Sequence, residues 1–187
     1  MVIVAFIFLK IIQLNVFMLT YIPSDSMSPT LPGPTEYNGQ PMIQTVAIYR
    51  KTKNIEKGDI IIFKQDNKWI TKRLIATPGD TVEIKNGFVY INDTILKEDY
   101  VSEQIDLNYV FSKQVVPENS YFVLGDNRNN SYDSREFENT YISDKQIYGS
   151  LCHYWILNIG SRKSAEKKVQ LTAYTVPLHI REEFVLP

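Results

Sequence analysis

Residues 81–92 read Thr-Val-Glu-Ile-Lys-Asn-Gly-Phe-Val-Tyr-Ile-Asn, and this stretch decides the fold class. Two β-type runs flank Asn86-Gly87, the pair that best satisfies a two-residue hairpin turn, because both central residues there need positive φ. Further strand-like runs bounded by turn residues cover 42–49, 59–63, 69–76, 121–124 and 147–157. No amphipathic helix of three turns is predicted after residue 22. We therefore expect a mainly β fold with coiled antiparallel, barrel-like sheets.

The composition excludes several classes of protein. The chain has 187 residues and 44% hydrophobic composition, which is enough for one domain with a real core. Its 20 basic and 21 acidic residues leave a net charge of −1, so no basic surface for nucleic acid is predicted. The single cysteine, Cys152, excludes an internal disulfide and is expected to be a small buried apolar group. His153 and His179 show no metal-ligand spacing, so we predict neither a metal nor another cofactor.

An apolar segment opens the chain. Fifteen of the eighteen residues in 2–19 are apolar, which approaches the length of a bilayer span, although Lys10 and two other polar residues interrupt it. Pro23 is expected to end the helix. We predict an uncleaved membrane anchor helix over residues 1–22. The alternatives are a cleaved secretory signal peptide, for which the basic start and small-residue cleavage site are missing, and a buried core helix.

The remaining chain divides into two parts. Residues 23–157 are predicted to form one β domain, with a small hairpin insertion at about residues 80–120. Residues 158–187 have weak β character, and no role is assigned to this C-terminal extension.

The segment 23–31 reads Pro-Ser-Asp-Ser-Met-Ser-Pro-Thr-Leu and directly follows the apolar stretch. Its prolines stiffen the chain, and a nucleophile must be held rigidly against a carbonyl. Ser26 is therefore the candidate nucleophile. The competing interpretation is that Ser24 and Ser26 only turn the chain where the helix ends.

A serine needs an activating base, and Lys72 is the candidate. The strand period of residues 69–76 places Ile70, Lys72 and Leu74 on one face, so the lysine has apolar neighbours. Desolvation there lowers the pKa of an amine toward the working pH. The alternative is a lysine that extends into solvent from the rim of a sheet.

A polar loop follows the predicted strand 121–124. Residues 125–135 read Gly-Asp-Asn-Arg-Asn-Asn-Ser-Tyr-Asp-Ser-Arg, and such a loop can form hydrogen bonds that orient a base, or can be an ordinary solvated turn. Arg73 points away from Lys72 and needs a carboxylate if it is buried, for which Asp126 is a candidate.

Taken together, these segments resemble the type I signal peptidases, the membrane-anchored Ser/Lys endopeptidases that release secretory leader sequences. Residues 23–31 are similar to the nucleophile box of that family, and 57–63 to the strand that follows it. Residues 72–80 are similar to its lysine box and 125–135 to its C-terminal box, which is the most specific. The resemblance runs from about residue 2 to residue 157.

The resemblance implies a catalytic role for four residues. Ser26 would be the nucleophile and Lys72 the general base. The Ser24 hydroxyl would join the backbone N–H of Ser26 in the oxyanion hole, and Ser131 would orient the Lys72 amine. The family glycine between the two serines is Asp25 here. A lysine at position 72 favours the bacterial or organellar branch of the family.

The resemblance also implies structural pairs, with Asp126 against Arg73 and Asp133 against Arg135. The substrate would be the Ala-x-Ala-like end of a preprotein signal peptide, extended between the chain near Ile22 and the strand near Ile70. The predicted substrate-binding residues, of which the first three are equally core candidates, are Ile22, Met27, Leu31, Ile70 and Thr71.

The expected partners are therefore preprotein signal peptides and the lipid bilayer. The expected location is the cytoplasmic (inner) membrane, with a single span and the catalytic domain on the extracytoplasmic side. Two alternatives stay open, namely a Ser/Lys autoprotease of the SOS-repressor type and an inactive membrane-tethered β binding module.

Overall fold

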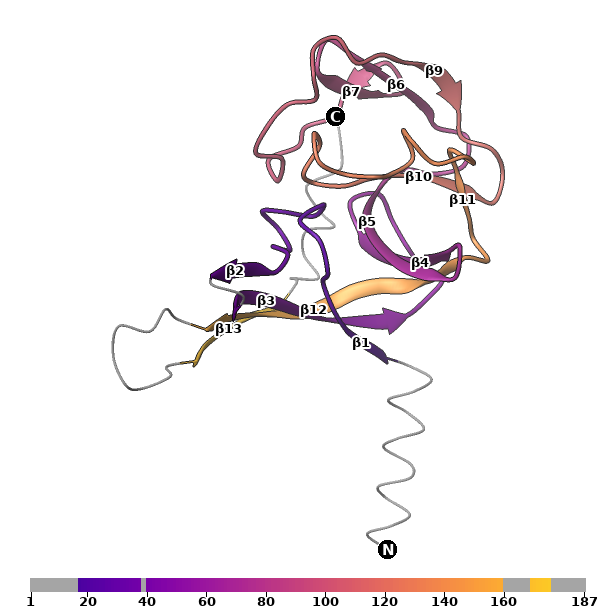
Figure 1. Cartoon of the computed structure of the whole chain (residues 1–187). Coiled ribbons are helices and arrows are strands. Elements are labelled where there is room, and N and C mark those ends of the chain that lie inside the picture. The colour runs from indigo at the N-terminus through magenta and orange to yellow at the C-terminus, as the bar shows by residue number, and fades with distance from the viewer. Residues whose placement is uncertain (1–16, 38–39, 160–168, 176–187) are drawn as a thin grey trace, which may run out of the picture.

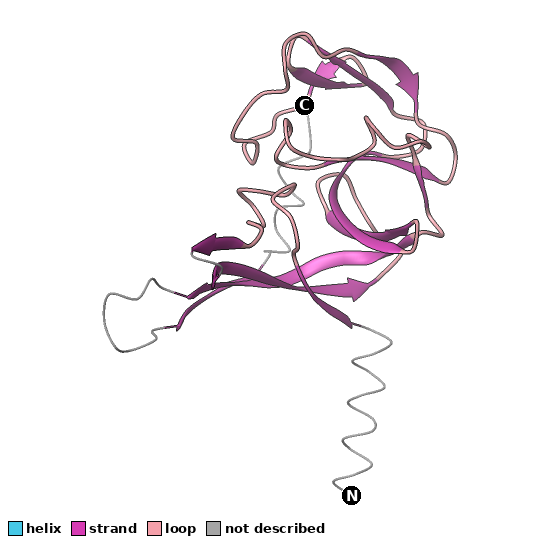
Figure 2. Ribbon diagram, in the orientation of Figure 1, coloured by secondary structure: helices cyan, strands magenta, loops and turns pink. Residues whose placement is uncertain are grey.

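The computed structural model describes residues 17–37, 40–159 and 169–175, and every regular element in these ranges is a strand (Figures 1 and 2). The strands are β1 (Phe17–Tyr21), β2 (Thr35–Tyr37), β3 (Gln40–Lys51), β4 (Ile60–Gln65), β5 (Lys68–Ala76), β6 (Thr81–Lys85), β7 (Phe88–Ile91), β8 (Thr94–Ile95), β9 (Phe111–Val115), β10 (Ser120–Leu124), β11 (Ile142–Ser143), β12 (Ile147–Ile159) and β13 (Val169–Thr175). The expectation of a mainly β fold is confirmed.

Two antiparallel sheets organise the chain. The main sheet has nine strands in the order β1-β3-β12-β4-β5-β10-β11, with β13 paired to β12 and β2 paired to β3. The small sheet has the order β8-β7-β6-β9. The long strand β12 joins the N-terminal strand β3 to β4, which in turn pairs with β5, the strand that carries Lys72.

Local turn chemistry accounts for the short hairpins. Asn86 and Gly87 adopt φ values of 51° and 79°, as the predicted turn between β6 and β7 requires. Asp66 and Asn67 do the same between β4 and β5, with φ values of 48° and 62°. This second turn was not predicted, because an Asp-Asn pair lacks the glycine that usually marks one.

The N-terminal prediction needs a correction. Residues 17–21 were expected inside the anchor helix, but they form β1, in which Thr20 pairs with Ala47 of β3. The backbone N–H of Ile22 continues this ladder to the carbonyl of Thr45 at 2.9 Å. The neighbouring strand β3 supplies hydrogen-bonding groups along its whole edge, and this pairing outweighs apolar helical periodicity. The rest of the predicted anchor, residues 1–16, lies outside the described residues, and in the described ranges no helix has the length and apolarity to span a membrane.

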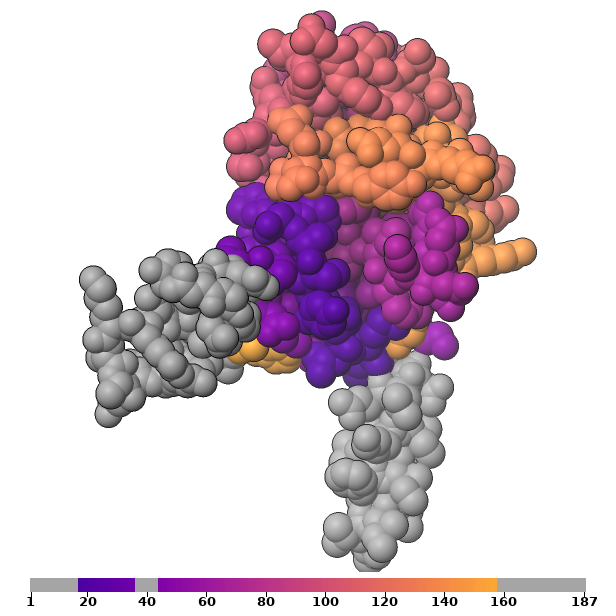
Figure 3. Space-filling view, in the orientation of Figure 1, coloured from indigo at the N-terminus to yellow at the C-terminus, as the bar shows by residue number. Residues whose placement is uncertain are grey.

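The insertion is larger than the expected hairpin, because β8 and β9 extend β6 and β7 to four strands. One apolar cluster joins this small sheet to the main sheet, with Val82, Ile84 and Phe111 packed against Phe122 and Leu124 of β10. Figure 3 shows the insertion stacked on the segment around β10, at the end of the molecule opposite β1. The small sheet therefore shares its core with the strands that carry the site described next.

In the C-terminal extension, the described residues are the last two of β12 and the strand β13, which pairs with β12 from Ile159↔Val169 to His153↔Thr175. The other residues beyond 159 lie outside the described ranges.

Candidate active site

The segment that carries Ser26 is a series of tight turns between β1 and β2. The carbonyl of Asp25 accepts from Ser28 N at 2.9 Å, and the Asp25 carboxylate accepts from Gly33 N at 3.0 Å. The carbonyl of Ser26 accepts from Asn127 N at 3.1 Å. Residues from two distant parts of the chain thus fix the backbone on both sides of the serine side chain.

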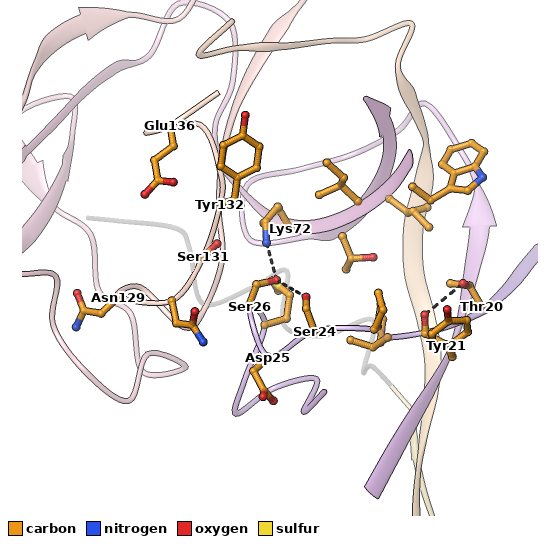
Figure 4. Close-up of a pocket in the computed structure, with 18 residues that line it drawn as sticks. Thr20, Tyr21, Ser24, Asp25, Ser26, Lys72, Asn129, Ser131, Tyr132 and Glu136 are labelled. Atoms are coloured by element: carbon orange, nitrogen blue, oxygen red, sulfur yellow. Dashed lines mark hydrogen bonds between the residues drawn. The ribbon is translucent and has the colours of Figure 1, made fainter. Parts of the chain in front are cut away.

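Lys72 meets Ser26 directly. Its Nζ lies 2.6 Å from Ser26 Oγ, and the lysine is only 3% exposed (Figure 4). The pKa of Lys72 is lowered to about 8, chiefly by burial and with a contribution from the nearby Arg135, against the opposing effect of Asp133 and Asp126. A substantial fraction of this amine is therefore neutral slightly above neutral pH, and a neutral amine can accept a proton from a hydroxyl.

The strand period of β5 explains this burial. Leu74 is fully buried, and Ile70 packs against the apolar cluster to which Leu74 belongs. On the other side of the strand, Ile75 belongs to the cluster shared with the small sheet. Leu74 and Ile75 thus belong to different apolar clusters, although Ile70, Thr71 and Lys72 all line one cavity.

Ser24 lies next to the pair. Its hydroxyl oxygen is 3.3 Å from Ser26 Oγ, and its side chain faces the same cavity (Figure 4). An exposed hydroxyl at this distance can rotate toward an oxygen that forms on a substrate bound at Ser26.

Ser131 is near the pair, but the expected hydrogen bond to Lys72 is not formed. Ser131 lines the same cavity as Lys72, yet its buried Oγ has no hydrogen-bond partner among the described residues. It is packed against Gly125, where an added Cβ would lie 2.1 Å from Ser131 Oγ and 2.4 Å from the Ser26 carbonyl oxygen. The loop therefore approaches the nucleophile more closely than any residue but glycine allows.

Both predicted ion pairs are present, and both are buried. Arg73 donates from Nε and Nη2 to Asp126 at 2.8 and 2.6 Å, and Thr30 Oγ1 donates to the same carboxylate at 2.6 Å. Arg135 donates to Asp133 at 2.8 and 2.9 Å. Asp133 also accepts from the N–H of Gly125 at 3.0 Å, which ties this pair to the loop behind Ser26.

A cavity of about 710 Å³ surrounds the Ser26–Lys72 pair. Of the predicted substrate-binding residues, Ile22, Met27, Ile70 and Thr71 line it. Leu31 does not line this cavity: it is fully buried in the apolar cluster with Met27. The hydrogen bond from Leu31 N to the Met27 carbonyl, at 2.8 Å, closes a turn that directs this side chain inward.

Several residues of this site carried no predicted role. Further residues of the cavity wall are Thr20, Tyr21, Pro23, Asp25, Ile62, Trp69, Asn129, Asn130, Tyr132 and Glu136. In Figure 4, Asn129, Tyr132 and Glu136 lie on one side of the Ser26–Lys72 pair, and Thr20 and Tyr21 lie on the other. Four of these residues belong to the polar loop 125–135 or follow it directly, and the density of polar residues there was the available signal.

The described residues contain no group of three or more His, Cys, Asp or Glu side chains that could hold a metal ion. The chemical groups that converge in the cavity are a hydroxyl, a buried amine and a second hydroxyl. Such a set is suited to acyl transfer through a serine.

The chain is similar to known peptidases. Residues 1–155 match the family described as "Signal peptidase, peptidase S26". "Signal peptidase I" of Leptolyngbya laminosa is 37% identical over 149 residues, which are 74% of this chain and 68% of that protein. "Signal peptidase I S" of Bacillus subtilis is 32% identical over 158 residues, which are 80% of this chain and 82% of that protein. A crystal structure of a signal peptidase I from Enterococcus faecalis shares 34% identity and covers 52% of this chain and 97% of its own, with a TM-score of 0.46.

Proposed function

The chain belongs to the signal peptidase family S26, and from this premise we propose that it is a membrane-anchored serine endopeptidase that removes signal peptides from exported preproteins. Ser26 is the nucleophile and Lys72 is the general base. The observation that carries this proposal is the 2.6 Å approach of a buried lysine amine to a serine hydroxyl inside a cavity.

The reaction begins when the neutral Lys72 amine takes the proton of Ser26 Oγ, which then attacks the scissile carbonyl. The negative oxygen that forms accepts hydrogen bonds from the Ser24 hydroxyl and the Ser26 backbone N–H. The Lys72 ammonium then protonates the leaving amine, and water hydrolyses the acyl-enzyme with Lys72 again as the base.

The oxyanion role of Ser24 can be tested separately. Removal of one oxyanion donor typically lowers kcat by about 10²–10³-fold. We expect Ser24→Ala to show a loss in that range with little change in KM. Steady-state kinetics on a signal-peptide substrate would measure this, and an unchanged kcat would remove Ser24 from the oxyanion hole.

The substrate is the end of a signal peptide in an extended conformation. β1 lies at one end of the strand order of the main sheet, so an extended peptide can add to its outer edge by backbone pairing. Ile22 and Ile70 give an apolar wall to the cavity next to the nucleophile, which suits the small side chains of an Ala-x-Ala-like end. Backbone pairing supplies affinity, and the shallow apolar wall supplies selectivity.

The location follows from the same function. We place the chain in the cytoplasmic (inner) membrane with one span near the N-terminus and the β domain on the extracytoplasmic side. Exported preproteins present their cleavage sites there, at the bilayer surface.

Cleavage of a preprotein in detergent by the wild type, Ser26→Ala and Lys72→Met tests the proposal. The wild type is expected to release the signal peptide, and both variants are expected to lose cleavage while keeping the wild-type circular dichroism. Cleavage by either variant at the wild-type rate would disprove the dyad. A folded but inert wild type would favour a binding module, and cleavage of its own chain alone would favour an autoprotease.

A further inference from the structure

Two residues of the insertion contact the active-site framework from one side. Glu98 and Tyr100 lie in the segment between β8 and β9, far in sequence from Ser26 and Lys72. We propose that both are positioning residues of the active site, with Tyr100 holding Arg73 beside Lys72 and Glu98 holding the loop that fixes Ser26. This inference rests on the proposed function.

Tyr100 acts on the strand that carries the base. The guanidinium carbon of Arg73 lies 3.8 Å from the centre of the Tyr100 ring, within the range of a cation–π contact. Arg73 also donates to the Gly58 carbonyl at 2.8 Å and to Asp126. The Tyr100 ring packs against one face of the guanidinium, and it thereby holds Arg73 in the orientation that pairs with Asp126.

Glu98 acts on the loop 125–135, and this loop carries Ser131 and contacts the backbone of Ser26. It accepts two hydrogen bonds from the guanidinium of Arg128, the one from Nη1 at 2.6 Å. Arg128 is 3% exposed and donates from Nε to the Gly125 carbonyl at 3.1 Å. Asn127 lies between Gly125 and Arg128 in the sequence, and its backbone N–H donates to the Ser26 carbonyl. A displacement of Arg128 is therefore transmitted to the backbone of Ser26.

The two residues are themselves linked. Tyr100 Oη donates to Glu98 Oε1 at 2.8 Å. Burial, followed by the Glu98 carboxylate, raises the pKa of Tyr100, so the phenol stays a neutral donor across the working range. Glu98 and Tyr100 thus form one hydrogen-bonded unit that contacts Arg73 on one side and Arg128 on the other.

This unit also affects the charges around the base. The charged groups that act on Lys72 are Asp133, Asp126 and Arg135, and the carboxylates of Asp25 and Glu136 line the same cavity. The positive charge of Arg73 offsets the negative charge of Asp126, to which it donates two hydrogen bonds. If Arg73 moves away from Asp126, that carboxylate stabilises the Lys72 ammonium more strongly, and the lysine becomes harder to deprotonate.

The test compares Tyr100→Leu, Tyr100→Phe and Glu98→Gln with the wild type. Tyr100→Leu removes the aromatic face, and we expect the acid limb of the kcat/KM profile to move to higher pH. Tyr100→Phe keeps the ring and is expected to keep the limb at its wild-type position. Glu98→Gln removes the charge that orients Arg128, and we expect kcat to fall by about 10-fold with KM retained, because small misplacements of reacting groups cost about 10²-fold or less.

A control variant and the melting temperatures separate positioning from stability. Glu103→Gln changes an exposed carboxylate of the same insertion segment and is expected to match the wild type. The proposal is overturned if Tyr100→Leu and Glu98→Gln lower the melting temperature but keep the wild-type kcat and pH profile well below that temperature. It is also overturned if Tyr100→Phe moves the limb as far as Tyr100→Leu does. Should Tyr100→Leu not fold, Glu98→Gln decides the outcome through kcat.

A direct titration makes this test independent of the proposed function. The lysine Cε resonances of the labelled protein report the pKa of Lys72, with Lys72→Met to assign the signal. An upward shift in Tyr100→Leu supports the positioning role even if no preprotein is cleaved, and an unchanged titration in a folded Tyr100→Leu overturns it. If instead the Ser26–Lys72 assignment is wrong, Ser26→Ala will cleave the preprotein as fast as the wild type does.

Discussion

At the scale of single residues, the site depends on one amine that the fold keeps out of water. Lys72 is buried on β5, and its neighbours include two carboxylates that favour the charged form. Desolvation still prevails, since the pKa lies at about 8 instead of the ordinary 10.5. The lysine is therefore destabilising for the fold and useful for the chemistry.

The pH dependence follows from this shift. We expect kcat/KM to rise with pH through about 8, as the Lys72 ammonium loses its proton in the folded protein. Between about 8 and 10.5 the unfolded chain binds the proton more tightly than the folded one, so this lysine makes stability rise with pH in that window. Below about 8 its unfavourable contribution is constant.

The variant Lys72→Met removes that contribution. Its melting temperature at pH 7 is expected to exceed that of the wild type, and the difference is expected to shrink toward pH 10. Thermal unfolding at both pH values measures this. A difference that does not depend on pH would mean that the amine is not desolvated.

Gly125 is a second residue on which the site depends, because there is no room for a side chain at this position. We expect Gly125→Ala to abolish most activity, because the new methyl group would collide with Ser131 Oγ and with the Ser26 carbonyl. Gly79→Ala is the matched control. It places a Cβ at a φ of +87° with no atom within 4 Å, so it should lower stability by about 1 kcal/mol and spare activity. Equal activity losses in the two variants would contradict the contact argument.

At the scale of elements, the hairpins were predictable where the turn residues are distinctive, and Asn86-Gly87 was enough to place β6 and β7. The β1 strand was not predictable, because residues 17–21 continue the apolar stretch that was expected to form a membrane helix. Only pairing with β3 selects the extended conformation. Likewise the pairing of Ser26 with Lys72 is a contact between distant segments, and the motif resemblance suggested it where periodicity alone could not. The roles of Glu98 and Tyr100 gave no local signal.

The turn between β4 and β5 yields an element-scale prediction. Asn67 has a φ of 62° and is exposed, so glycine would adopt this conformation without strain. We expect Asn67→Gly to raise the melting temperature by about 1–3 °C, in line with a gain of up to about 1 kcal/mol for a chain of this size. Asn67→Ala should lower it. The reverse order in differential scanning calorimetry would refute the turn assignment.

At the scale of the whole molecule, one apolar cluster spans both sheets. Val82 and Phe111 of the small sheet pack against Phe122 of the main sheet. Glu98 and Tyr100 add polar contacts across the same boundary. The insertion therefore shares an apolar core with the main sheet.

We expect the two sheets to unfold in a single transition. Native-state hydrogen exchange should give the amides of β6 and of β4 the same opening free energy under increasing denaturant. Earlier exchange of the whole small sheet, at a denaturant concentration that leaves β4 protected, would show that the insertion opens independently.

The central position of β12 has a consequence for synthesis of the protein. This strand comes late in the chain, yet it lies between β3 and β4, so the main sheet cannot assemble until the ribosome has released it. While translation continues, β3 and β4 have open edges that can pair with other nascent chains. Strand β5, which carries Lys72, is therefore joined through β4 and β12 to β3 and β1, the strand that leads into the Ser26 segment, only after β12 has been synthesised.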